Sequence, residues 1–233
     1  MEFLLQSLWE SIQMIVRLDR DLLSALATTL KVSMTSTAIA SMIALPLGFL
    51  IARNEFPGKR VVQNLLRTAL ALPTVVVGLL VYAFVARNAP LGEMRLLFTP
   101  AAIIIGQVLL IVPLITALVH AAMEENVKVI YEESLLLGAS PFQASIKALV
   151  ESRLAVMTAV MTGFGRVVSE VGISLVLGGN IRGLTRTITT AITLETSQGD
   201  FAVAFALGIV LLTLVLLVNM VIIQMAGLRR ESI

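Results

Sequence analysis

The chain lacks cysteine altogether and has only one histidine among its 233 residues. Without cysteine there is no disulfide framework, no thiolate metal site and no cysteine nucleophile. The single imidazole of His120 is too few for a multi-histidine metal site. The chain also lacks a large excess of either charge, because 17 basic and 15 acidic residues leave a formal net charge of only +2. That balance offers no basic patch for a nucleic acid, so nucleic-acid binders are excluded together with thiol chemistry and these metal centres.

Sequence motifs for enzymatic chemistry are missing as well. The phosphate-binding pattern G-x-x-x-x-G-K-[ST] does not occur, and Gly58-Lys59-Arg60 is a lone match to its end. No apolar stretch carries paired carboxylates, a serine–lysine pair or a histidine–glutamate pair at a spacing that catalysis could use. We therefore expect a chain that is not an enzyme, hydrolyses no ATP by itself and holds no cofactor of its own.

Apolar residues are what the chain has in excess. Hydrophobic residues make up 58% and charged residues 14% of the sequence, against roughly 45–50% and about 25% in a typical soluble domain. Five stretches are long and apolar enough to cross roughly 30 Å of hydrocarbon. They cover residues 22–52, 65–86, 101–122, 154–177 and 201–226. Because these stretches are apolar on all sides, we predict an all-α polytopic membrane protein, one transmembrane domain over residues 1–233.

The first 21 residues predict a different kind of helix. They mix apolar side chains such as Leu8 and Trp9 with charged side chains such as Glu10 and Arg17. This spacing indicates an amphipathic helix that lies in the membrane interface. The segment lacks the basic start and the small-residue cleavage site of a signal peptide. A sixth span is the alternative.

The distribution of basic residues bears on orientation. Five spans place the two termini on opposite sides of the membrane, with the 53–67 loop, the 123–153 loop and the C-terminus on one side. That side carries nine of the 17 basic residues and the other side seven, with Arg166 inside a span. The difference weakly favours a cytoplasmic location for the side with nine.

Two predicted spans contain residues that disturb a helix. Pro73 and Thr74 lie in the second span, and Gln107 and Pro113 lie in the third. Proline removes a backbone hydrogen bond, and the freed carbonyl groups then need protein or water as partners. The kinks expected at these residues are therefore compatible with the lining of a pathway. An adjustment of helix shape alone is the alternative.

Ionisable side chains occur in the fourth span. Arg166 and Glu170 lie four residues apart, on one face of the predicted helix, with Ser169 between them. An ionisable side chain within a span is a functional candidate, because leaving it in lipid costs about 2.5–3.5 kcal/mol or more. An intrahelical ion pair that fixes the helix against its neighbours is the alternative interpretation.

The 123–153 loop is long and has helical spacing of its own. Gly138 and Ala139 interrupt that spacing, Ser140 is a good N-cap, and Pro141 suits the first position of a second helix. Two short helices joined at a glycine are typical of a docking element for a soluble partner. An amphipathic connector that rests on lipid headgroups is the alternative.

A second polar loop covers residues 178–200 on the opposite side. Its glycines expose backbone N–H groups, and its arginines and threonines add charge and hydroxyl groups, a chemistry that suits an oxyanion. The candidate residues are Asn180, Arg182, Thr185 and Arg186. An ordinary external turn followed by a short amphipathic helix is the alternative.

Residues Tyr131 to Ser140 resemble the cytoplasmic glutamate-alanine-alanine signature of permease subunits of ATP-binding-cassette importers, since Glu132 precedes Gly138 by six residues. Glu133 and Ser134 replace the two alanines, and the usual final leucine-proline is missing. The resemblance implies the type I importer permease fold and a coupling helix that fits a cleft in a separate ATPase subunit. It implies coupling contacts by Glu132, Glu133, Leu137, Gly138, Ala139 and Ser140.

Residues 165–172 and 178–187 resemble the molybdate, tungstate and sulfate branch of these permeases, and residues 189–201 are most similar to the tungstate permeases. The resemblance implies a homodimer, two ATPase subunits that bind ATP and Mg²⁺, and an extracytoplasmic binding protein. It implies import of a tetrahedral oxyanion, tungstate first, with molybdate or sulfate as the alternative. A membrane anchor or sensor that transports nothing is a remoter alternative. The pathway would involve Pro73, Thr74, Gln107, Pro113, Arg166, Ser169 and Glu170.

Overall fold

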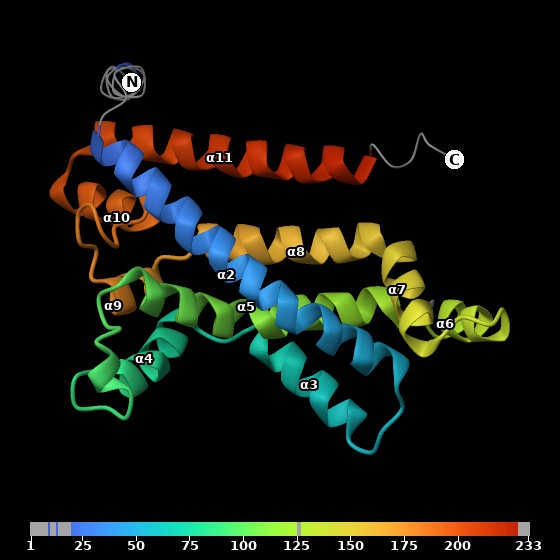
Figure 1. Cartoon of the computed structure of the whole chain (residues 1–233). Coiled ribbons are helices and arrows are strands. Elements are labelled where there is room, and N and C mark those ends of the chain that lie inside the picture. The colour runs from blue at the N-terminus through green and yellow to red at the C-terminus, as the bar shows by residue number, and fades with distance from the viewer. Residues whose placement is uncertain (1–8, 10–12, 14–19, 125–126, 228–233) are drawn as a thin grey trace. The chain divides into compact units, whose positions relative to one another are not determined.

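The computed structural model describes residues 9, 13, 20–124 and 127–227, and in these ranges the regular elements are all helices (Figure 1). The all-α prediction is confirmed. The predicted interfacial helix over residues 1–21 lies almost entirely outside the described residues. The helices are α2 (Arg20–Arg53), α3 (Lys59–Ala69), α4 (Thr74–Val85), α5 (Pro100–Met123), α6 (Val127–Leu136), α7 (Pro141–Glu151), α8 (Arg153–Val168), α9 (Gly172–Gly178), α10 (Ile188–Gln198) and α11 (Phe201–Gly227), with a 3-10 turn, η1, over Gly92–Met94.

Three single helices are long and apolar enough to cross a membrane. They are α2, α5 and the Phe201–Val221 part of α11. Two further pairs, α3 with α4 and α8 with α9, pass the same test together but are bent by more than 40° at a short break. The described residues therefore hold three candidate spans, or up to five if each bent pair is one span. The five predicted stretches match these elements, but the second and fourth are not continuous helices.

The break in the second predicted span follows from its proline. α3 ends at Ala69, and α4 begins at Thr74, directly after Pro73. Pro73 has an extended backbone (φ −64°, ψ 124°), and a proline also disfavours helical geometry in the residue before it. The apolar run of 65–86 is thus divided between two helices.

The break in the fourth predicted span lies between Val168 and Gly172. Arg166 is in the last turn of α8, whereas Glu170 is in the break. The expectation that both lie on one face of a continuous helix is therefore wrong. The reason is that the Glu170 side chain caps the start of α9. Its Oε1 accepts a hydrogen bond of 3.1 Å from the N–H of Ile173, which would need a backbone carbonyl as acceptor if the helix were continuous.

The third predicted span is an unbroken helix in spite of its proline. α5 runs from Pro100 to Met123 with Pro113 inside it, and α2 similarly contains Pro46. Pro113 therefore does not divide the third span in the way that Pro73 divides the second.

The described chain forms two compact units. One comprises residues 20–36, 73–107 and 165–220. Its core includes a cluster at the starts of α2, α10 and α11, made by Leu22, Ala25, Ile188, Ala191 and Leu207. Thr29 Oγ1 accepts a 2.8 Å hydrogen bond from the N–H of Ile188, which ties α10 to α2. In the same unit α4 and α9 lie side by side (Figure 1).

The other unit comprises residues 37–72, 108–124, 127–164 and 221–227. Small residues allow its helices close contact. A Cβ atom at Gly48 would lie 2.8 Å from Val119, and one at Gly163 would lie 2.7 Å from Ile115. Such close approach at small residues is typical of helix packing in membranes, where lipid is as apolar as the side chains and tight packing holds helices together.

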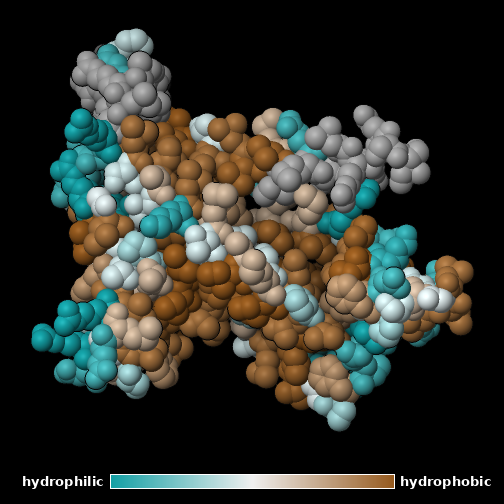
Figure 2. Space-filling model, viewed as in Figure 1, coloured by the Kyte–Doolittle hydropathy of each residue, from teal (hydrophilic) through white to brown (hydrophobic). Residues whose placement is uncertain are grey.

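Large apolar side chains lie on the outside of the helices. Met42, Leu212 and Leu80 are 77%, 67% and 59% exposed, on α2, α11 and α4 respectively. Figure 2 shows brown apolar side chains over much of the visible surface, with teal polar side chains gathered in a few places. An apolar exterior of this extent suits lipid contact, which supports a multi-pass membrane protein.

Candidate functional site

Residues 127–151 form a helical hairpin, and its turn is determined by residues that are neighbours in the sequence. α6 ends in a left-handed turn at Gly138 (φ +87°), in which the N–H of Ala139 donates to the carbonyl of Ser134 at 3.0 Å. A glycine is favoured there by its backbone angle and not by lack of space, since a Cβ would meet nothing within 4 Å. Ser140 then begins α7, and both hydrogen bonds of a capping box join it to Gln143. The predictions of Ser140 as N-cap and Pro141 as first helical residue are confirmed.

The tip of this hairpin presents apolar side chains to the outside. Leu136, Leu137 and Phe142 are 87%, 89% and 75% exposed. Glu132 and Glu133 on α6, together with Gly138 and Ser140, are also exposed, and Ala139 is half-buried. Exposed apolar side chains of this kind suit either a docking surface for a partner or contact with lipid headgroups.

Of these three tip residues, the sequence predicts a contact role for Leu137 but not for Leu136 or Phe142. One signal could have identified Phe142. It is a bulky apolar residue in the first turn of a helix whose buried positions are Ala144 and Ala148, so it lies off the buried face. Leu135, Leu136 and Leu137 are all apolar, so the sequence does not distinguish the two most exposed leucines from Leu135, which is 38% exposed.

The base of the hairpin is attached to the segment between α2 and α3. The Arg53 guanidinium lies 3.8 Å from the centroid of the buried Tyr131 ring. Glu55 Oε1 lies 2.5 Å from Lys128 Nζ and 3.1 Å from Lys59 Nζ. The hydrogen bonds from Lys128 and from Lys59 lower the pKa of the Glu55 carboxyl group below its usual value, so it is ionised at neutral pH.

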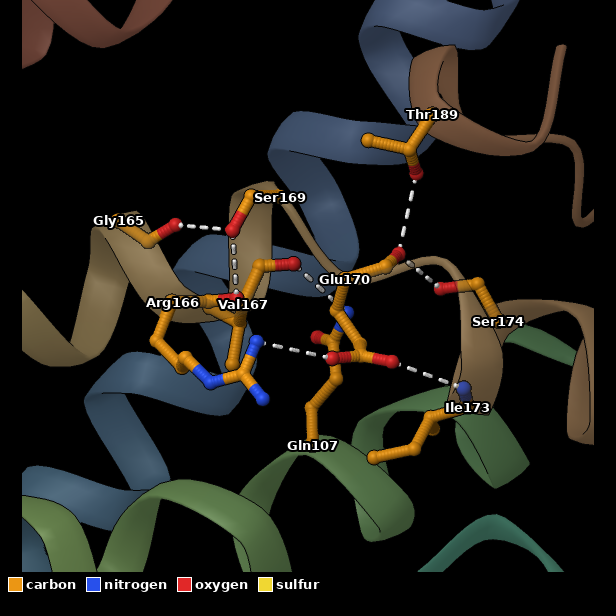
Figure 3. Close-up of polar contacts among 9 residues, drawn as sticks. All are labelled: Gln107, Gly165, Arg166, Val167, Ser169, Glu170, Ile173, Ser174 and Thr189. Atoms are coloured by element: carbon orange, nitrogen blue, oxygen red, sulfur yellow. Dashed lines mark hydrogen bonds and ion pairs between the residues drawn. The ribbon is translucent and has the colours of Figure 1, made fainter. Parts of the chain in front are cut away.

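A polar cluster occupies the break between α8 and α9 (Figure 3). Glu170 is at its centre and is almost fully buried. Its Oε2 pairs with Arg166 Nη1 at 3.4 Å, while its main-chain carbonyl accepts hydrogen bonds from Ser174 Oγ at 3.2 Å and Thr189 Oγ1 at 3.0 Å. Because the side chain and the carbonyl bind to three different parts of the chain, Glu170 fixes the geometry of the break.

Arg166 and Ser169 differ from Glu170 in exposure. The Arg166 side chain is 40% exposed, against 2% for Glu170. Ser169 is exposed, and its hydroxyl lies 2.9 Å from the carbonyl of Gly165 and 3.1 Å from that of Arg166. The Arg166 side chain is therefore partly accessible, while the buried Glu170 carboxylate pairs with one of its nitrogens.

Gln107 has a structural role in the same unit. Its Oε1 accepts a 2.8 Å hydrogen bond from Ser36 Oγ, and its Nε2 donates a 3.3 Å bond to the carbonyl of Val167. The side chain is 1% exposed. The amide thus joins α2, α5 and α8, and both of its ends are occupied.

The start of α4 meets the break between α8 and α9. A Cβ at Gly172 would lie 2.9 Å from Thr74 Oγ1 and 3.3 Å from Glu170 Oε1. The interrupted second span and the interrupted fourth span therefore meet at a glycine. Of the seven predicted pathway residues, this unit holds Pro73, Thr74, Gln107, Arg166, Ser169 and Glu170, whereas Pro113 belongs to the other unit.

In the 178–200 loop, two of the four predicted residues make firm contacts within the chain. Thr185 is buried, and its hydroxyl donates to the carbonyl of Gly178 at 2.5 Å and accepts from the N–H of Ile181 at 3.0 Å. Arg182 forms an ion pair with Asp21 through both Nε and Nη2. Both contacts stabilise the loop itself.

The other two residues are less constrained. Asn180 has a left-handed backbone (φ 52°), and its Oδ1 is buried with no hydrogen-bond partner among the described residues. Arg186 is half-buried, and its Nε similarly lacks a partner there. Arg186 lines a cavity of about 210 Å³ together with Asp21 and Glu195, so its surroundings are of mixed charge.

The sequence of this chain matches a known protein family. The model of the "binding-protein-dependent transport system inner membrane component" family matches residues 44–225. The tungstate uptake system permease protein TupB of Peptoclostridium acidaminophilum is 36% identical over 222 residues, which cover 95% of this chain and 97% of that protein. TupB of Campylobacter jejuni is 37% identical over 221 residues, 95% and 92% of the two chains.

Other proteins similar to this chain are also permeases. A probable anion ABC transporter permease protein of Haloferax volcanii is 36% identical over 203 residues, 85% of this chain and 88% of that protein. Permeases named for sulfate or molybdenum transport match at 24–26% identity. A family match over more than three quarters of the sequence, on a chain of apolar helices, leads to one conclusion. The chain belongs to the family of binding-protein-dependent transport system inner membrane components, the membrane subunits of ATP-binding-cassette importers.

Proposed function

We propose that this chain is the permease subunit of an ATP-driven importer that moves tungstate, a tetrahedral oxyanion, across the cell membrane. The observation that carries the proposal is the similarity, over 95% of this chain, to two proteins named as tungstate uptake permeases. Family membership supports the transport role, since members of this family are transport components and not catalysts.

The complete transporter contains further subunits. In the proposed complex two copies of this chain form a homodimer, and two ATPase subunits bind ATP and Mg²⁺ and carry out hydrolysis. An extracytoplasmic binding protein delivers the anion. The absence of a phosphate-binding loop from this sequence and the exposed apolar tip at Leu136, Leu137 and Phe142 support a separate ATPase subunit, docked on the hairpin at the cytoplasmic side.

The anion path is proposed to border the two breaks that meet at Gly172. Interrupted spans are used in transporters because the start of a half-helix carries partial positive charge and unpaired N–H groups. α4 starts at Thr74 beside that glycine, and the half-exposed Arg166 adds a full positive charge in the same unit. Thr74, Arg166 and Ser169 are the residues offered to the anion, while Gln107 and Glu170 hold them in place.

On the opposite side of the membrane, the 178–200 loop is proposed to receive the loaded binding protein. Asn180, Arg182 and Arg186 offer amide and guanidinium groups there, and Thr185 keeps the loop in shape. A binding protein that closes around an oxyanion already provides selectivity, so these residues need only recognise the protein and let the anion pass.

Two alternatives are separated from this proposal by experiment. The chain could serve molybdate or sulfate with the same architecture, which the relatives named for these anions support. A membrane anchor or sensor is remoter, because an anchor needs neither interrupted spans nor a docking hairpin.

The test is the ATPase activity of the complete complex in liposomes, with the binding protein loaded in turn with tungstate, molybdate, sulfate or phosphate. Stimulation at the lowest concentration by tungstate is the expected result. Equal or better stimulation by another anion would keep the mechanism and overturn the substrate. If an assembled complex responds to none of them, the transport proposal fails and the anchor or sensor gains support.

A further inference from the structure

The hairpin formed by α6 and α7 is not held in place by its own two helices alone. Two side chains from the segment that joins α2 to α3 contact the first helix of the hairpin, α6. Arg53, the last residue of α2, contacts Tyr131, and Glu55 in the following loop pairs with Lys128. Lys59, the first residue of α3, pairs with Glu55. We refer to Arg53, Glu55, Lys59, Lys128 and Tyr131 together as the clamp.

The contacts of the clamp are close, and two of its side chains are well shielded. The Arg53 guanidinium lies over the Tyr131 ring at 3.8 Å, and that ring is only 6% exposed. Lys59, at 8% exposure, and Lys128 both approach the same oxygen of Glu55, at 3.1 and 2.5 Å. A cation–π contact to a shielded ring is stronger than one in water, because less hydration competes with it.

We propose that the clamp makes α6 move as one body with the end of α2 and the start of α3, so that Arg53, Glu55 and Tyr131 are positioning residues for coupling. This inference rests on the proposed function, since it assigns a route to the movement that an ATPase subunit delivers to the hairpin. The residues contact neither anion nor nucleotide. They determine how much of the hairpin's displacement reaches the spans.

Two elements can carry that displacement onward. α2 continues from Arg53 without interruption through 34 residues. α3 leads from Lys59 to the break at residues 70–73, directly before α4. A second contact supports α3 one turn further along the same face: Gln63 Nε2 lies 2.7 Å from His120 Nε2 near the end of α5. Packed elements of this kind transmit a shift because they resist deformation, whereas a loop free of contacts would absorb it.

An isolated surface ion pair would not justify this inference, since such pairs contribute little. Here the Glu55 carboxylate joins two lysines from different helices, and the cation–π contact lies in the same segment. The chain thus holds α6 from two points, Tyr131 and Lys128, which lie three residues apart and therefore on one face of the helix.

The experiment uses the complete complex in liposomes with labelled tungstate and measures the number of anions imported per ATP hydrolysed. Arg53→Gln and Tyr131→Leu remove the cation–π contact, whereas Tyr131→Phe keeps a ring. We expect the first two to lower import per ATP by about fivefold, a size that suits one such contact, while ATP hydrolysis and ATPase binding persist. Tyr131→Phe is expected to stay near the wild-type ratio.

Charge reversal tests the ion pair separately. Glu55→Lys is expected to lower import per ATP, and the double variant Glu55→Lys with Lys128→Glu is expected to restore part of it, because the change at position 55 still places a positive charge against Lys59. Arg60→Gln is the matched control, because it removes an exposed positive charge from the start of α3 that is not part of the clamp.

If assembly, hydrolysis and import all fall together while import per ATP stays constant, the contacts only stabilise the fold and the inference is overturned. An unchanged ratio in every variant overturns it too, as does an equal loss in Arg60→Gln. If the wild-type complex itself neither imports the anion nor responds to the loaded binding protein, the failure is that of the proposed function.

Discussion

Gly138 shows how one residue determines the shape of the hairpin formed by α6 and α7. Its left-handed backbone (φ +87°) reverses the chain between α6 and α7, and a side chain would have open space around it. Any substitution therefore acts through the backbone and through the surface that a partner meets. An L-residue other than glycine costs about 1–2 kcal/mol in this conformation.

We predict that Gly138→Asp abolishes coupling to the ATPase subunit and leaves membrane insertion intact. The substitution strains the turn and adds a charge at the surface proposed for docking. Membrane yield and substrate-stimulated ATPase activity are the measurements. Gly199→Asp is the matched control for membrane yield alone, since Gly199 ends α10 with φ +84° and equally open surroundings but lies in the loop proposed to receive the binding protein. Normal stimulated activity in Gly138→Asp would contradict the assignment of the hairpin.

Phe142 gives a second test at this scale. Its side chain is 75% exposed, so Phe142→Ser should change the stability of the chain by no more than about 0.5 kcal/mol. Burial of an aromatic side chain in a partner's cleft is worth far more, and we expect ATPase-subunit binding to weaken by about tenfold or more. Thermal midpoints and binding affinity in lipid nanodiscs separate the two effects. Unchanged affinity would remove Phe142 from the docking surface.

At the scale of elements, contact between helices depends on residues without side chains. α5 approaches α9 at Gly106, where a Cβ would lie 2.6 Å from Ile173 and 2.7 Å from Leu177. Gly165 in α8 has no such neighbour within 4 Å. Gly106 therefore allows close packing of two helices, whereas Gly165 has no such role, although both lie in apolar helices.

Gly106→Ala is expected to destabilise the protein by about 1–3 kcal/mol, because the packing has no room for a methyl group. Gly165→Ala should instead stabilise it by about 0.5–1 kcal/mol, since alanine loses less conformational freedom in a helix. Thermal midpoints in one detergent compare the two variants. A similar shift for both would show that α5 and α9 do not approach in this way.

The break between α8 and α9 depends on the Glu170 carboxylate. Glu170→Ala leaves the buried N–H of Ile173 without its acceptor and Arg166 without its partner, so we expect a loss of about 1–3 kcal/mol. Glu170→Gln keeps an oxygen for the N–H and should lose less. The measurement is the thermal midpoint of each purified variant. Equal losses in the two variants would mean that the hydrogen bond to Ile173 contributes nothing.

At the scale of the whole molecule, the proposed function demands other subunits. We predict that native mass spectrometry of the complex gives two copies of this chain with two ATPase subunits, because one hairpin offers one docking tip. The binding protein should add a single copy. A complex with one permease chain would contradict the homodimer, although the family membership would stand.

The class of protein, the apolar stretches and the hairpin can all be predicted from the sequence. These features depend on properties that are local in the chain: the length of apolar runs, the proline after a serine cap, and the glycine before it. The cap at Ser140 and the turn at Gly138 are where the sequence predicts them because neighbouring residues alone create them.

Contacts between residues that are distant in the sequence become visible only in the folded chain. Nothing near Glu170 in the sequence indicates that Thr189 would bind its carbonyl group, or that Thr74 would lie against the same break. The sequence likewise does not show that Arg53 would cover Tyr131, or that both ends of the Gln107 amide would be occupied. The physical reason is that a hydrogen bond or a ring contact between distant residues depends on how helices pack, and packing is a property of the whole chain and not of any segment.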